Sequence, residues 1–99
     1  MMFRDPLVRK AWEVRRQAER FPVEVLLETA VWLEEKYHGT PSKEIAIALA
    51  LQYFILAMRQ TLASPVMAKE YFSRALRWRE EAARAFPTRR RLPAPVNLN

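Results

Sequence analysis

The chain has 99 residues, of which 51% are hydrophobic, and a formal net charge of +6 from 17 basic and 11 acidic side chains. It contains no cysteine and a single glycine, Gly39, which excludes disulfides, thiolate metal sites, a cysteine nucleophile and glycine-rich phosphate loops. This length predicts one domain with a modest core, close to the size at which association with a second copy often adds stability.

The N-terminal residues give no sign of a secretory or membrane segment. No apolar stretch of signal-peptide type follows Met1, so we expect a cytoplasmic protein. The longest apolar run, residues 45–58, has 14 residues, well short of the roughly 20 that cross a bilayer. We therefore predict no membrane partner.

Arginine outnumbers lysine 13 to 4, a bias typical of a GC-rich or thermophilic source.

Four X-Pro steps divide the chain into helix-forming stretches, and they predict an all-α, four-helix bundle-like fold. Proline suits the first turn of a helix, where its missing N–H leaves no hydrogen bond unmade. The side chain before the proline is a capping type in three of the four steps and is expected to cap the free N–H groups of that turn. The steps are Asp5-Pro6, Phe21-Pro22, Thr40-Pro41 and Ser64-Pro65.

The first two stretches have amphipathic patterns. Residues 5–20 place apolar side chains at helical spacing opposite a largely basic face. Residues 22–38 have an apolar stripe that we expect to be buried, including Val31, and an exposed acidic face of Glu24, Glu28 and Glu35. This second helix is predicted to stop at Gly39, in the left-handed conformation that glycine favours after a helix end.

The third stretch, residues 41–62, has almost no polar face. A helix that is apolar on all sides must be covered on all sides, and three short neighbours seldom do so. Its alanines would let another helix approach closely. Gln52 is expected either to make an ordinary hydrogen bond or to fix register or oligomeric state. We therefore predict a homodimer, with this candidate interface: Ala46, Ala50, Gln52, Tyr53, Phe54 and Ala57.

The fourth stretch, residues 64–86, is again amphipathic and completes a single helical domain predicted over residues 1–86. Residues 87–99 contain three prolines and no helical periodicity, and we predict a flexible basic tail. Charge is shared unevenly along the chain. Residues 4–20 and the tail each have a net charge of +3, whereas residues 22–38 have −3.

Few residues could carry chemistry. Glu35 and His38 have the Glu-x-x-His spacing of carboxylate-bridged metal bundles, but a chain with one histidine would need a dimer to supply the second copy. His38 in a last helical turn, where positive charge is favoured, is the simpler interpretation. Ser42 and Ser64 lie at helix starts, where capping explains them. We therefore predict no cofactor, no metal site and no enzymatic activity.

The basic side chains are the most usable functional signal. If the first and fourth helices are adjacent, their arginines and those of the tail form one phosphate-binding surface. Trp78 could stack on a base there, although a tryptophan that covers a helix interface is commoner. The candidate phosphate- or partner-binding residues are Arg9, Arg16, Arg20, Arg74, Arg77, Trp78, Arg84, Arg89, Arg90 and Arg91.

The sequence therefore predicts a small helical interaction module, an accessory subunit or regulator that binds a protein partner and forms a homodimer. The alternative is an accessory protein that binds DNA or RNA through phosphate contacts. Residues 40–46 resemble the opening of a helix-turn-helix, but this interpretation is disfavoured because residues 47–59 continue as helix formers and no turn follows.

Overall fold

The structure, a computed structural model of the chain, describes residues 6–87. This range holds four α-helices and no strand: α1 (Pro6–Ala18), α2 (Val23–Gly39), α3 (Lys43–Gln60) and α4 (Pro65–Ala85). The all-α fold is thus confirmed, and each helix lies within two residues of its predicted bounds. The cap Asp5, the arginines Arg89, Arg90 and Arg91, and the predicted tail beyond Pro87 lie outside the described residues.

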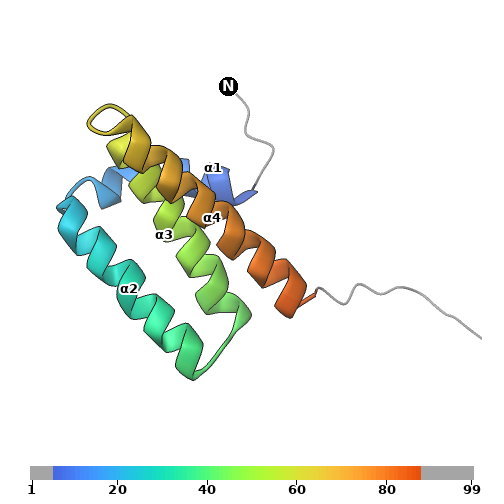
Figure 1. Cartoon of the computed structure of the whole chain (residues 1–99). Coiled ribbons are helices and arrows are strands. Elements are labelled where there is room, and N and C mark those ends of the chain that lie inside the picture. The colour runs from blue at the N-terminus through green and yellow to red at the C-terminus, as the bar shows by residue number, and fades with distance from the viewer. Residues whose placement is uncertain (1–5, 88–99) are drawn as a thin grey trace, which may run out of the picture.

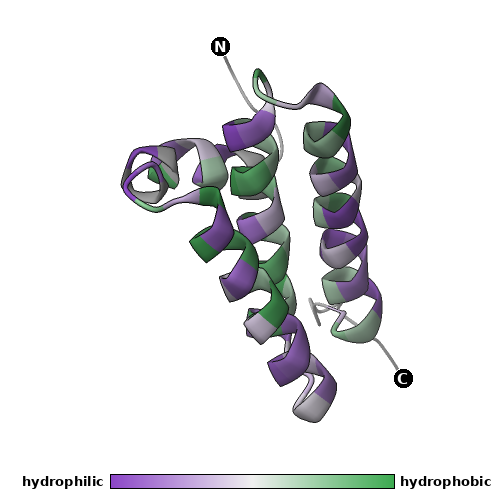
Figure 2. Ribbon diagram, turned by 60° about the vertical axis from the view of Figure 1, so that its left-hand side comes forward, coloured by the Kyte–Doolittle hydropathy of each residue, from purple (hydrophilic) through white to green (hydrophobic). Residues whose placement is uncertain are grey.

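Helix α3 is the centre of the fold. The extensive helix–helix contacts of the described residues are those of α3 with α4, α2 and α1. In Figure 1, α2 runs beside α3, and α1 passes behind α3 and α4. Hydrophobic and hydrophilic residues alternate along the outer helices (Figure 2), as amphipathic helices around a core require. Of the fifteen buried hydrophobic residues among those that the structure describes, eight belong to α3.

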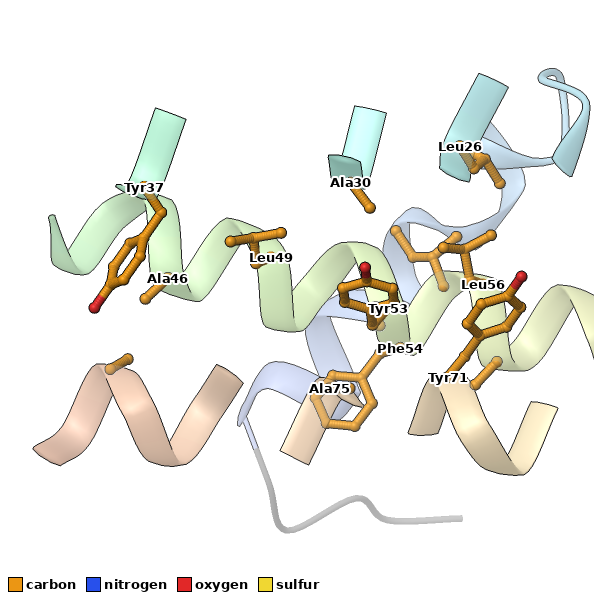
Figure 3. Close-up of a cluster of buried hydrophobic side chains, with 14 residues drawn as sticks. Leu26, Ala30, Tyr37, Ala46, Leu49, Tyr53, Phe54, Leu56, Tyr71 and Ala75 are labelled. Atoms are coloured by element: carbon orange, nitrogen blue, oxygen red, sulfur yellow. The ribbon is translucent and has the colours of Figure 1, made fainter. Parts of the chain in front are cut away.

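The chain's own helices cover the face of α3 that the sequence assigned to a second copy. Ala46 and Ala50 are fully buried, and Tyr53, Phe54 and Ala57 are at most 7% exposed. Figure 3 shows α2 and α4 on either side of several of these side chains. In this fold the five residues have almost no exposed surface, which argues against the predicted interface.

Gln52, the sixth residue of that predicted interface, has an ordinary hydrogen-bonding role. Its Nε2 donates to the backbone oxygen of Leu26 in α2, at 2.9 Å. This bond ties α3 to α2 and satisfies a half-buried amide in an otherwise apolar helix. Among the alternatives for Gln52, the hydrogen bond to backbone is the one observed.

The helix starts follow the predicted chemistry with two changes. Ser64 caps α4, as predicted, by accepting from the Met67 N–H. The side chain that caps α3 is Ser42 rather than Thr40, because Ser42 has the extended backbone of an N-cap and accepts from the Ile45 N–H at 3.1 Å. Pro22 is itself the N-cap residue of α2, and its carbonyl accepts from Val25 and Leu26.

The end of α2 differs from the prediction. Gly39 is the last helical residue, and no glycine of the described chain has a positive φ. The helix is closed instead by Thr40, whose N–H donates to the oxygen of Lys36 at 2.8 Å. The left-handed conformation expected at Gly39 is therefore wrong.

Among residues 6–87, no helix has the length and apolar character needed to span a bilayer.

Candidate functional site

A cleft of about 600 Å³ lies between α2 and α4. The two helices pack on α3, and side chains from both line the opening between them. Figure 3 shows Tyr37 of α2 and Tyr53 of α3 pointing into the space between the outer helices. The residues that line the cleft are Glu34, Tyr37, His38, Arg74, Arg77, Trp78 and Glu81.

Two tyrosine–glutamate hydrogen bonds at this cleft join α2 to its neighbouring helices. The Tyr37 hydroxyl donates to Glu81 of α4 at 2.6 Å. The Tyr53 hydroxyl donates to Glu34 of α2 at 2.7 Å. Both distances are typical of O–H···O⁻ bonds, which are stronger than bonds between neutral groups. Together they bind α2 to α4 and to α3.

The cations of the cleft are also engaged. Arg74 donates to Glu70 at 3.0 Å and places its guanidinium 5.8 Å from the centre of the Tyr53 ring. Arg77 is 3.9 Å from the same glutamate, and Arg84 forms an ion pair with Glu81. The cleft therefore satisfies much of its own polarity, which leaves less for a ligand.

The electrostatics of the cleft favour neutral tyrosines. Burial and the hydrogen bond to Glu34 raise the pKa of Tyr53 to about 12. The hydrogen bond to Glu81 raises the pKa of Tyr37, and the same bond lowers the pKa of Glu81. The phenols thus keep their protons near neutral pH, which suits structural donors better than general acids or bases.

Trp78 is part of this structural cluster. Its ring meets the Tyr37 ring edge-on, with centroids 5.0 Å apart, and Phe86 meets Tyr37 similarly at 6.4 Å. Trp78 is half-buried and packs against the core. Two roles were predicted for Trp78: stacking on a base, or the commoner one of covering a helix interface. In the structure Trp78 covers a helix interface.

The predicted basic residues that the structure describes lie in two places. Arg74 and Arg77 line the α2–α4 cleft, and Arg84 pairs with Glu81, which lines it too. Arg9 and Arg16 are exposed on α1, and Arg20 follows that helix. Within residues 6–87 the extensive contacts of α1 are with α3, and no contact of comparable extent joins α1 to α4, so the adjacency on which the combined phosphate-binding surface depended is not seen there.

The Glu-x-x-His motif is divided between two sites. His38 lines the α2–α4 cleft, whereas Glu35 lines a separate hollow on α2. Within residues 6–87 there is no group of three or more histidine, aspartate or glutamate side chains placed to hold a metal ion.

That second hollow, of about 450 Å³, is the most distinctive exposed surface of α2. Val31 is 48% exposed and Trp32 56% exposed, and glutamates surround them. Lys36 places its ammonium 5.0 Å from the centre of the Trp32 ring. We call this surface the α2 outer face; it consists of Glu24, Leu27, Glu28, Val31, Trp32 and Glu35.

Only the acidic part of the α2 outer face was predicted from the sequence. The prediction that Val31 is buried is wrong, and Trp32 was not among the predicted site residues. The signal that was missed is the position of Trp32 relative to two glutamates. Glu28 lies four residues earlier and Glu35 three residues later, and residues three or four positions apart lie on the same face of a helix. An aromatic side chain within an exposed acidic row is not a core pattern.

Comparisons with known proteins give this site no precedent: no family model matches the chain, and no similar curated protein or solved structure was found.

Proposed function

We propose that this protein is a non-catalytic helical interaction module that binds a protein partner through the α2 outer face. The observation that carries the proposal is the exposure of Val31 and Trp32 inside a rim of glutamates. Exposed aromatic side chains in a polar surround are typical of protein-binding surfaces. The α2–α4 cleft is the weaker candidate because its glutamates already accept hydrogen bonds from tyrosines and Arg74 already bonds Glu70.

The chemistry of the α2 outer face defines the partner surface. Helix α2 has four glutamates and one lysine, a formal net charge of −3 in a chain of net +6. A complementary surface has an apolar centre to cover Trp32 and basic groups to meet the glutamates. The aromatic contact supplies most of the affinity, and the charges set orientation and partner choice.

Affinity capture from an extract of the source cells tests the proposal. Tagged wild-type protein is compared with Trp32→Ala and with a matched control, Val66→Ala, which truncates an apolar side chain that is 79% exposed on another helix. We expect proteins retained by the wild type and by Val66→Ala to be lost from Trp32→Ala. A retained set that is the same for all three proteins, or empty for all three, would contradict the proposal.

A second candidate function is binding of DNA or RNA through α1. The observation that favours it is that Arg9, Arg16 and Arg20 are all exposed on or just after this helix, in a chain of net charge +6. Fluorescence anisotropy with labelled single- and double-stranded DNA and RNA tests it. Phosphate binding predicts affinity that falls steeply with salt and drops in Arg9→Gln/Arg16→Gln/Arg20→Gln. Absence of binding at low salt would eliminate this function.

A further inference from the structure

Helix α1 presents a surface that mirrors the α2 outer face with opposite charge. Trp12 is 46% exposed, and its neighbours on the helix surface are Arg9, three residues earlier, and Arg16, four residues later. On α2, Trp32 has Glu28 and Glu35 at the same two spacings in reverse order. All four charged side chains are exposed. Each helix thus carries a half-exposed tryptophan between two charges, positive on α1 and negative on α2.

We propose that the partner bound by the α2 outer face is α1 of a second copy of this chain. The inference rests on the proposed function and names the partner. In a two-fold dimer the same contact forms twice, because α1 of each copy meets α2 of the other. Each contact brings Arg9 and Arg16 to Glu28 and Glu35, and it covers both tryptophans. The predicted homodimer is thereby placed on a different surface from α3.

The charge distribution favours a second copy as the occupant. Helix α1 has four basic side chains and one glutamate, a net charge of +3 that matches the −3 of α2. Among the four helices, α2 is the only one with a net negative charge, so the complementary surface for a basic helix of this chain lies there. Opposite charges across an interface also fix which surfaces meet.

Another exposed apolar surface gives no comparable argument. Leu62, Val66 and Met67 are 94%, 79% and 39% exposed around the turn between α3 and α4. No row of like charges accompanies them there, so the chemistry of an occupant is not defined. This surface therefore provides control positions rather than a second proposal.

Charge reversal tests the second-copy inference with the full chain. The first variant, Glu28→Arg/Glu35→Arg, makes the α2 face basic, so that both faces are basic. The second variant, Arg9→Glu/Arg16→Glu, makes the α1 face acidic, so that both faces are acidic. In sedimentation velocity over a concentration series, we expect a wild-type dimer and dissociation constants about tenfold or more higher for each variant alone. An equimolar mixture of the two variants should form a heterodimer, because every contact again joins opposite charges.

Combining all four substitutions in one chain provides a second check. That variant exchanges the signs of the two faces, so it should dimerise with an affinity close to that of the wild type. Circular dichroism of each variant verifies its helical structure, and Val66→Ala should leave the dimer unchanged. Trp12→Ala and Trp32→Ala, which alter no charge, should each weaken it.

Three results would overturn the inference. The first is a wild-type protein that stays monomeric at all concentrations, and the second is a dimer that tolerates both reversals. The third is a dimer lost on removing residues 88–99 but not on reversing α1, which would make that segment the occupant. The proposed function can be distinguished from this inference. If the wild-type protein is monomeric but still captures another protein through Trp32, the second-copy inference fails and the proposed function holds.

Discussion

The two sides of α2 use similar residues to opposite effect. Towards α3 and α4, Glu34 accepts from Tyr53 at 2.7 Å and Tyr37 donates to Glu81 at 2.6 Å, and Trp78 packs on Tyr37. On the α2 outer face, Trp32 is 56% exposed beside Glu24, Glu28 and Glu35. The same residue types therefore make a structural clamp where neighbouring helices supply partners, and on the outer face they form the exposed surface for which we propose docking.

Core substitutions beneath the clamp should have the largest effect on stability. Leu49 of α3 is fully buried in the hydrophobic core. We expect Leu49→Ala to lower the free energy of unfolding by about 2–5 kcal/mol, because it removes buried methyl groups and leaves a cavity. Urea denaturation followed by circular dichroism measures the change. A loss below about 1 kcal/mol would mean that α3 is not held between these helices.

Alkaline pH should weaken the clamp through Tyr53. Its pKa is raised to about 12 in the folded protein from an ordinary value of 10.0, so the neutral phenol is favoured by folding. The resulting stabilisation is complete below pH 10 and is lost as the pH rises towards 12. Its full size is about 2–3 kcal/mol. Urea midpoints between pH 8 and 12 measure it, and Tyr53→Phe should show a smaller alkaline loss than the wild type.

Tyr37→Phe should have a smaller effect than Leu49→Ala, because it removes one hydrogen bond and keeps the ring packing. We expect a lower Tm at neutral pH. The hydrogen bond from Tyr37 is the largest cause of the lowered pKa of Glu81, so the stabilisation from Glu81 is present above its ordinary pKa and lost as pH falls through the lowered value. Thermal unfolding at pH 2–6 should show a weaker acid dependence in Tyr37→Phe than in the wild type.

Trp32→Ala should have the smallest effect on the stability of the monomer. The side chain is 56% exposed, so its truncation should change the free energy of unfolding by about 0.5 kcal/mol or less at a concentration where the protein is monomeric. The same variant should have a large effect on association. If Trp32→Ala destabilises the monomer as much as Leu49→Ala, the α2 outer face is part of the core and the contrast between the two sides of α2 fails.

Local signals in the sequence were sufficient for the helices. Proline and serine at the starts act within one turn, so the helix bounds follow from them. The choice between Thr40 and Ser42 as the cap of α3 could not be made this way, because both residue types cap helices and only the backbone shows that Ser42 has the N-cap conformation.

The surfaces were harder to predict than the helices. Helix α2 has apolar residues on several sides, so periodicity alone did not separate buried Ala30 from exposed Val31. The clamp joins residues 19 and 44 positions apart, and such pairs depend on how the helices pack. The coverage of α3 by three short helices was underestimated for the same reason.

The central position of α3 also has a consequence for hydrogen exchange. Each outer helix packs mainly on α3, so an outer helix can open while the rest of the fold stays together. The amides of α3 then exchange with solvent deuterium only when all its neighbours have separated. We expect α3 to contain the slowest-exchanging amides of the chain, and their exchange to report the global free energy of unfolding.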